Sequence, residues 1–93
     1  MNFEWDPDKS SSNVVKHGVD FFEASTVFGD PFELTVPDPS HSEGEFRFLS
    51  LGSSTVGRLL VVSYTERDER IRIISAREAN PRERKQYESR RTS

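Results

Sequence analysis

The stretch Arg70-Ile71-Arg72-Ile73-Ile74-Ser75-Ala76-Arg77 has the β-branched residues of a buried strand, yet it also contains three arginines. A charged side chain enters the centre of a sheet at a high cost in free energy, unless it pairs with an opposite charge or meets a charged ligand. The planar guanidinium group suits phosphate oxygens well. We therefore predict a strand at 70–76 whose arginines either bind carboxylates of the protein or meet an anionic ligand.

Two further runs that are rich in apolar residues, 45–51 and 58–65, precede this stretch in the chain. A loop of Gly, Ser and Thr separates the first two runs, and the charged turn 66–69 separates the last two. Connections this short join antiparallel neighbours, so the segment 45–76 predicts a three-stranded meander. Its middle strand is apolar on both faces from Leu59 to Val62, which is typical of a central strand.

The rest of the chain predicts two helices before the meander and one after it. Asp6-Pro7 and Asp20–Glu23 are helix-start patterns, and they predict helices that run to about residue 17 and to about residue 28. Asn80-Pro81-Arg82-Glu83 begins the last helix in the same way. Strands are expected at 1–5 and 32–36, and a polar loop at 37–44. The sequence thus predicts one α+β domain over residues 1–93, with the order β-α-α-β-β-β-β-α and a small, mainly antiparallel sheet.

Composition excludes several classes of protein. Of the 93 residues, 32% are hydrophobic and 31% are charged, and no apolar run approaches the length of a membrane span, so we expect a cytoplasmic protein without membrane contact. The chain has no cysteine, which excludes disulfides and thiolate metal sites. Its two histidines stand 24 residues apart and no cluster has metal-ligand spacing, so we predict neither a metal nor a cofactor.

The charge is distributed unevenly. Residues 1–57 hold three Lys/Arg and ten Asp/Glu, whereas residues 58–93 hold ten Lys/Arg and six Asp/Glu. The overall net charge of −3 argues against nucleic-acid binding by bulk charge. A local arginine patch can still bind nucleic acid or an acidic protein segment, and the uneven charge does not distinguish the two.

Two arginines of the decisive stretch, Arg72 and Arg77, each have two interpretations. Arg72 and Arg77 differ by an odd number, so in an unbroken strand they point to opposite faces; Arg77 lies just past the expected strand end. Each either pairs with a local carboxylate, such as Glu66, Glu69 or Glu78, or binds a phosphate and stabilises charge during phosphoryl chemistry.

Lys16-His17-Gly18 ends the first predicted helix, where the helix dipole favours cations. The pair either has no further role, or His17 is a titratable group suited to proton transfer near neutral pH.

Glu45 and Arg47 lie two apart on one predicted strand and hence on one face, as a surface ion pair or a catalytic pair. We expect His41 to be solvated in its loop, and Tyr64 and Tyr87 to pack as partly buried amphipathic side chains.

An ordered series of short segments resembles a known family. The segments are Phe3–Pro7, Asn13, Lys16–Val19, Phe21/Phe22, Ala24, Val27-Phe28, Asp30-Pro31, His41–Glu45, Arg47-Phe48, Arg72–Arg77, Ala79, Arg82–Arg84 and Tyr87. Over residues 2–88 this series resembles the BrnT family, the toxins of bacterial type II toxin–antitoxin modules. The resemblance implies a RelE-like fold and an endoribonuclease that needs no metal and blocks translation by cutting RNA. It also implies a BrnA-type antitoxin, a toxin–antitoxin heterotetramer, and DNA binding only through the antitoxin.

The resemblance assigns roles to the candidate residues. Arg77 and Arg47 would stabilise charge on the phosphate, and His17 would transfer a proton when the RNA 2′-hydroxyl attacks. Lys16 would tune the imidazole or hold a phosphate, and Glu45 would serve as a base or orient Arg47. The RNA backbone would be bound by Arg72, Arg82 and Arg84. The alternative is a non-catalytic module or co-repressor that binds an acidic or amphipathic protein segment.

Overall fold

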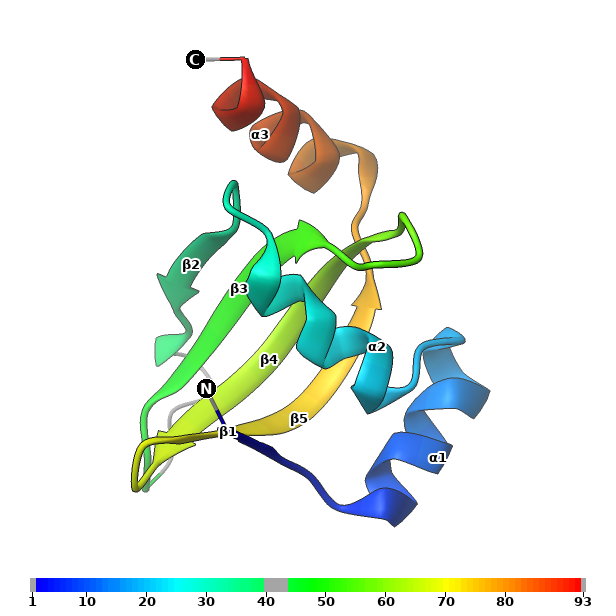
Figure 1. Cartoon of the computed structure of the whole chain (residues 1–93), viewed down its shortest axis with the longest axis vertical. Coiled ribbons are helices and arrows are strands. Elements are labelled where there is room, and N and C mark those ends of the chain that lie inside the picture. Colours follow the sequence, from blue (N-terminus) through cyan, green and yellow to red (C-terminus); the bar gives the residue numbers. More distant parts are fainter. Residues whose placement is uncertain (1, 40–43, 93) are drawn as a thin grey trace.

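The computed structural model describes residues 2–39 and 44–92, which form five strands and three α-helices (Figure 1). In chain order the elements are β1 (Asn2–Glu4), α1 (Pro7–His17), α2 (Phe21–Thr26), the 3-10 helix η1 (Val27–Gly29), β2 (Leu34–Pro37), β3 (Arg47–Ser53), β4 (Leu59–Arg67), β5 (Arg70–Glu78) and α3 (Pro81–Arg91). The predicted α+β class is confirmed. The prediction that His41 is solvated, and the inclusion of Met1 in the first strand, lie outside the described residues.

The five strands form one mixed sheet in the order β1-β5-β4-β3-β2. Strands β3, β4 and β5 pair antiparallel in sequence, which confirms the predicted meander, and β2 adds to it antiparallel. β1 pairs parallel with β5, because the chain crosses over through α1 and α2 before it returns to the sheet. The decisive stretch therefore lies between a parallel and an antiparallel neighbour.

Several predicted boundaries differ from the observed ones. β3 begins at Arg47 rather than Glu45, and β5 extends to Glu78. The charged turn is only two residues long, because Asp68 and Glu69 both adopt positive φ angles of 49° and 67°, as in a tight hairpin turn. The second helix is shorter than predicted, since α2 gives way to η1.

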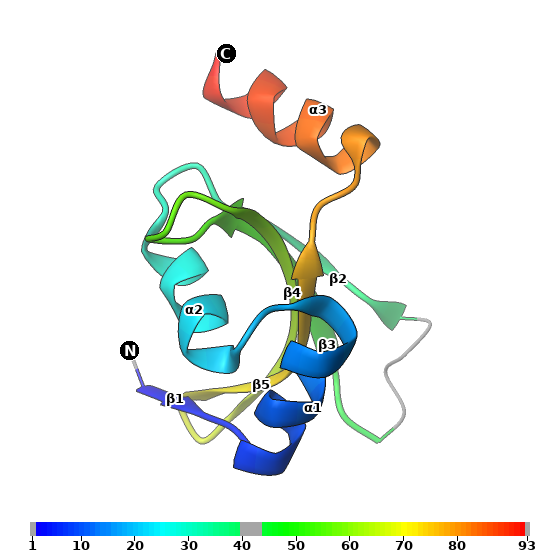
Figure 2. The same ribbon diagram turned by 90° about the vertical axis from the view of Figure 1, so that its right-hand side faces the viewer.

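One face of the sheet carries the main hydrophobic core. Helix α2 lies on this face (Figure 2), and it packs there with the preceding segment and η1. Phe28 adds a ring contact to Tyr64 with a centroid distance of 4.9 Å. We call this the covered face; its fully buried members include Val19, Phe21, Ala24, Val27, Leu60 and Val62.

The opposite face carries a smaller core at one end. Tyr87 of α3 packs there against Leu51, Leu59 and Val61. The Tyr87 hydroxyl donates a hydrogen bond to Asp30 Oδ2 at 2.5 Å, which ties α3 to the segment that follows η1. Among the described residues, the apolar cluster on this face includes Tyr87 of α3 but no residue of α1 or α2, and we call this face the open face.

A β-bulge changes which face Arg77 occupies. The pairing of β4 with β5 passes from Ser63 opposite Ser75 to Tyr64 opposite Ile73, so Ile74 is an extra residue in β5. In an unbroken strand, the odd spacing of Arg72 and Arg77 would place them on opposite faces, with the direction of Arg77 left open by its place past the expected strand end. The pairing is interrupted instead: the extra residue shifts the alternation by one and brings both arginines to the open face.

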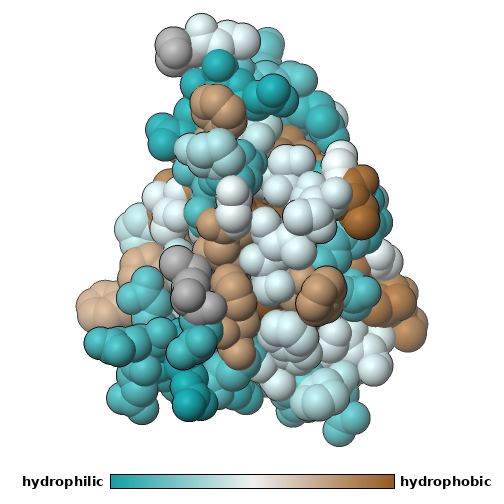
Figure 3. Space-filling view, in the orientation of Figure 1, coloured by the Kyte–Doolittle hydropathy of each residue, from teal (hydrophilic) through white to brown (hydrophobic). Residues whose placement is uncertain are grey.

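None of the described helices is long and apolar enough to cross a membrane. In the space-filling view of Figure 3, α3 at the top is mainly hydrophilic, and hydrophobic residues elsewhere on this side are scattered singly or in small groups.

Candidate functional site

The open face is organised in rows across β3, β4 and β5, because residues that are directly opposite in neighbouring strands share a face. The first row is Arg47, Thr65 and Arg72; the second is Leu49, Ser63 and Ser75; the third is Leu51, Val61 and Arg77. Successive rows lie roughly 7 Å apart along the strands. Two rows with arginine thus flank one row that contains two serine hydroxyls.

His17 lies beside the second and third rows of the open face. A hollow of about 80 Å³, which we call the small hollow, is lined by His17, Leu49, Val61, Ser63, Ser75, Ala76 and Arg77. The structure therefore brings together His17 and Arg77, two candidates that are sixty positions apart in the sequence. Lys16 lines a second, outer hollow of about 340 Å³, which shares His17 and Ser75 with the small one.

The end of α1 places His17. Gly18 adopts φ +71° as the left-handed C-cap, and its N–H donates to Val14 O at 2.8 Å, so the helix stops directly after the histidine. The side chain of Asn13, one turn earlier, is hydrogen-bonded to Val19 and to Ala76 of β5. Helix capping and the bonds of Asn13 thus fix the backbone of His17 beside β5, while its side chain is exposed.

Arg77 is oriented by Glu83, the third residue of α3. Its Nη1 and Nη2 each donate to one Glu83 oxygen at 2.8 Å, and Nη1 also donates to Glu78 O at 3.3 Å. The hydrogen bonds from Arg77 hold the pKa of Glu83 below its usual value, and those to Glu83 raise the pKa of Arg77. The local-carboxylate interpretation therefore applies to Arg77, but with Glu83 as partner in place of the predicted Glu66, Glu69 or Glu78.

The guanidinium of Arg77 still has donors to offer. It carries five N–H groups, of which three are engaged by Glu83 and Glu78. Within residues 2–39 and 44–92, the Nε–H and one Nη2–H have no protein partner. These two lie along one edge of the fork, the arrangement that binds two oxygens of a phosphate side by side.

Arg47 and Arg72 are half-buried in the first row, on either side of Thr65. Arg72 Nη1 lies 3.4 Å from Glu4 Oε2 of β1, so its partner is also not one of the predicted carboxylates. The parallel pairing places Glu4 opposite Arg72, and no local sequence pattern predicts that pairing. Thr65 is 1% exposed and donates to Phe46 O at 2.7 Å, which fixes the backbone just before Arg47.

Five candidates line neither hollow: Arg47 and Arg72 of the first row, and also Glu45, Arg82 and Arg84. Glu45 precedes β3, and its carboxylate accepts from Arg67 Nε at 3.0 Å, so the predicted placement of Glu45 beside Arg47 on one strand face is wrong. Arg82 and Arg84 are exposed on α3 and line neither hollow.

Sequence reasoning missed Ser63 and Ser75, the paired hydroxyls of the small hollow. Ser63 interrupts the apolar run of the central strand, and that interruption was the available signal. Ser75 was masked by the bulge, since its facing depends on the extra residue. Across the described parts of the chain, no group of three or more His, Asp or Glu side chains could hold a metal ion.

Known proteins place the chain in a family. A model of the family described as "Ribonuclease toxin, BrnT, of type II toxin-antitoxin system" matches residues 5–83. Among solved structures, the chain is similar to the ribonuclease toxin BrnT of Brucella abortus, determined at 1.1 Å, with a TM-score of 0.66 and 23% identity over 86% of this chain and 97% of that one. That likeness shows a shared fold, while no curated protein matches the chain. Because the family model covers most of the sequence, the chain belongs to the BrnT family of ribonuclease toxins from type II toxin–antitoxin systems.

Proposed function

We propose that this protein is an endoribonuclease toxin that cuts RNA without a metal ion and thereby blocks translation. The observation that carries the proposal is the small hollow, where the imidazole of His17 and the guanidinium of Arg77 flank two serine hydroxyls on an otherwise open sheet face. An open face admits an extended RNA strand, whereas a closed pocket would admit only a small molecule.

The chemistry uses the RNA's own 2′-hydroxyl as nucleophile. As the 2′-oxygen bonds to phosphorus, the bond from phosphorus to the 5′-oxygen breaks, which leaves a 2′,3′-cyclic phosphate and a free 5′-hydroxyl. Neutral His17 takes the proton of the 2′-hydroxyl, and the imidazolium then supplies a proton to the leaving 5′-oxygen.

The arginines act on the charge that develops on the phosphate. Arg77 presents its unoccupied edge to two phosphate oxygens, and Arg47, in the first row, adds positive charge further along the same sheet face. Arg72 and, from α3, Arg82 and Arg84 bind the flanking RNA backbone, while Lys16 holds a phosphate beside His17. Glu45 is left out of this catalytic set, because Arg67 engages its carboxylate.

The family also implies a partner. We propose a BrnA-type antitoxin that assembles with this toxin as a heterotetramer and supplies the contact to DNA, within a RelE-like superfamily of cytoplasmic toxins without cofactors. Membership in a type II toxin–antitoxin family supports an antitoxin partner of this kind.

The test is cleavage of RNA by the purified protein in EDTA, with free RNA and ribosome-bound RNA as substrates. We expect cleavage that leaves 2′,3′-cyclic phosphate ends and that stops when the nucleotide at the cleavage site is 2′-deoxy. Arg77→Ala and His17→Ala should each lower the rate by about 10²–10³-fold.

The matched control is Arg70→Ala, which removes an arginine from the same strand but from a different hollow, lined by Asn2, Phe3, Trp5, Phe22 and Ser25. This variant should keep most of the activity. Absence of cleavage on every RNA, or equal losses in all three variants, would reject the proposal.

A partner-binding role has its own supporting observation. Between β2–β4 and α3 runs an apolar groove of about 350 Å³, lined by Leu34, Val36, Leu49, Leu51, Val61, Glu83 and Gln86. Such a groove suits the apolar side of an amphipathic segment. If the protein arrests growth when expressed, and Arg77→Ala arrests growth equally, the non-catalytic binding module is the better account.

A further inference from the structure

Asn13 is the one buried residue of α1, a helix whose residues are all described. Its residue exposure is 5%, whereas the neighbouring Val14 and Val15 are 46% and 87% exposed. A helix that buries an amide and exposes two valines is not held by ordinary apolar packing. The amide must therefore do something at its buried position that an apolar side chain could not do.

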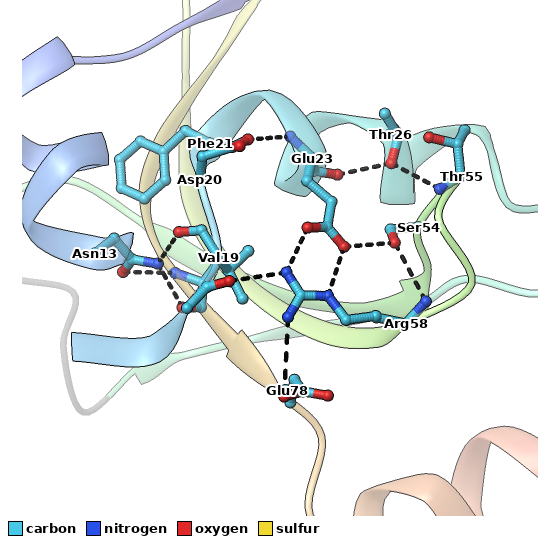
Figure 4. Close-up of polar contacts among 12 residues, drawn as sticks. Asn13, Val19, Asp20, Phe21, Glu23, Thr26, Ser54, Thr55, Arg58 and Glu78 are labelled. Carbon is cyan, nitrogen blue, oxygen red and sulfur yellow. Dashed lines mark hydrogen bonds and ion pairs between the residues drawn. The ribbon is translucent and has the colours of Figure 1, made fainter. Parts of the chain in front are cut away.

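The amide of Asn13 makes three hydrogen bonds (two of them on β5). Nδ2 donates to Val19 O at 2.8 Å and to Ala76 O at 2.7 Å, and Oδ1 accepts from Ala76 N at 3.2 Å. Figure 4 shows this amide between the segment after α1 and the backbone of β5. Both donors and the acceptor are used, so the side chain is fixed in position and in orientation.

The position on β5 explains why a side-chain amide is needed there. The parallel partner β1 ends at Glu4, opposite Arg72, so within residues 2–39 and 44–92 no strand borders the outer edge of β5 beyond that point. Ala76 would leave a backbone N–H and C=O unpaired at this edge. The amide of Asn13 has the same donor and acceptor pair as a peptide group, and it takes the place of the missing strand.

The three bonds also join the two segments that supply the small hollow. Val19 lies two residues after His17, and Ala76 lies between Ser75 and Arg77, directly after the bulge. We propose that Asn13 is a positioning residue for RNA cleavage, which holds His17 and Arg77 at the separation that the reaction needs. This inference rests on the proposed ribonuclease function, and it adds a residue that touches neither RNA nor the reacting atoms.

The test is Asn13→Asp, which keeps the size of the side chain and the acceptor but removes both donors. The variant, its control and wild type are assayed at a temperature where each is folded. We expect kcat of Asn13→Asp to be about 10–100-fold below that of wild type, since a small misplacement of catalytic groups has effects of this size. KM should change less than threefold, because the arginines that bind RNA are unaltered.

The matched control is Thr26→Val, another exchange of nearly equal volume. It removes the hydroxyl that accepts from Thr55 N at 3.0 Å and donates to Glu23 O at 2.6 Å, at the loop between β3 and β4 (Figure 4). A merely structural role for Asn13 predicts that both variants lose stability and that both keep the wild-type kcat per folded molecule. A folded Asn13→Asp protein with kcat within twofold of wild type would overturn the proposal.

Two NMR measurements test the placement of Asn13 without an assay of RNA cleavage. In Asn13→Asp the imidazole signals of His17 should shift, whereas in Thr26→Val they should not, and this comparison stands even if the wild-type protein cuts no RNA. If Asn13→Asp does not fold, the wild-type Nδ2 protons should exchange with solvent at least tenfold more slowly than those of exposed amides. Unshifted His17 signals in the folded variant, or fast Nδ2 exchange in wild type, would overturn the placement of Asn13.

Discussion

The two faces of one sheet differ in what they hold. On the covered face, β4 contributes Leu60, Val62 and Tyr64, which are buried under α2 and η1. On the open face, the same strand contributes Thr65, between Arg47 and Arg72, and Ser63, in the row between the two that contain arginines. Because side chains alternate along a strand, one element supplies both the apolar core and the polar site.

The difference between the two faces predicts which substitutions should lower stability and which should lower the rate of RNA cleavage. A change on the covered face removes apolar burial, which is the main source of stability in a chain of this size. A change at the arginines and hydroxyls of the open face removes charge or hydrogen bonds rather than apolar burial. Substitutions on the covered face should therefore change the free energy of unfolding, and substitutions at the polar rows of the open face should change the cleavage rate.

The largest effect is expected from Phe21→Ala on the covered face. Phe21 is fully buried, so its loss should lower the free energy of unfolding by about 3–5 kcal/mol. A domain of this length has a total stability of about 5–14 kcal/mol, so the loss removes a large share of it and we expect the variant to be partly unfolded at 37 °C. Urea denaturation measures the loss, and the cleavage rate per folded molecule should stay within twofold of wild type. A fall in that rate would show that the two faces are coupled.

A smaller effect is expected from Glu83→Gln, at the border between α3 and the open face. The amide keeps one oxygen for Asn80 N but gives up the paired contact with Arg77, so the guanidinium loses its fixed orientation. We expect kcat for RNA cleavage to fall by about tenfold. The free energy of unfolding should fall by about 1 kcal/mol, because the Arg77 side chain is 42% exposed and solvent screens the pair.

Glu88→Gln serves as the control for that variant, since it removes a carboxylate from the exposed surface of the same helix. It should leave cleavage unchanged. Faster cleavage by Glu83→Gln would contradict the expectation, because it would mean that Glu83 competes with the RNA phosphate for Arg77.

Local sequence patterns predicted most of the fold. Asp6-Pro7, Gly18 and Asn80-Pro81 marked helix ends that the structure has, because capping depends on residues within one turn. The meander was predictable from its short connections. At α2, Asp20 caps Glu23 N at 2.7 Å as the pattern predicts, but the Glu23 carboxylate turns to Arg58, which is distant in the sequence.

The site was less predictable, because it depends on long-range pairing. His17 and Arg77 were chosen as residue types, yet their meeting depends on Asn13 and on the bulge at Ile74, and no local pattern signals a bulge. The partner of Arg72 depends on the parallel pairing of β1, which short connections cannot reveal. The candidate residue types could therefore be chosen from the sequence, whereas their arrangement in space required the fold.

The smallest effect is expected from Tyr87→Phe, beneath α3. Burial and the hydrogen bond to Asp30 raise the pKa of Tyr87 to about 12, above the usual value near 10 in an unfolded chain. The neutral hydroxyl thus contributes stability that is fully present below pH 10 and is lost as the pH rises through 12. At pH 8 the variant should be less stable than wild type by about 1 kcal/mol, the typical loss for one hydrogen bond. Between pH 10 and 12 this difference should shrink, because only wild type loses the contribution.

Urea denaturation at several pH values measures the difference in stability, with Tyr64→Phe as the control for removal of a hydroxyl from the covered face. A difference that stays constant up to pH 12 would show that the Tyr87–Asp30 contact does not hold α3 on the open face.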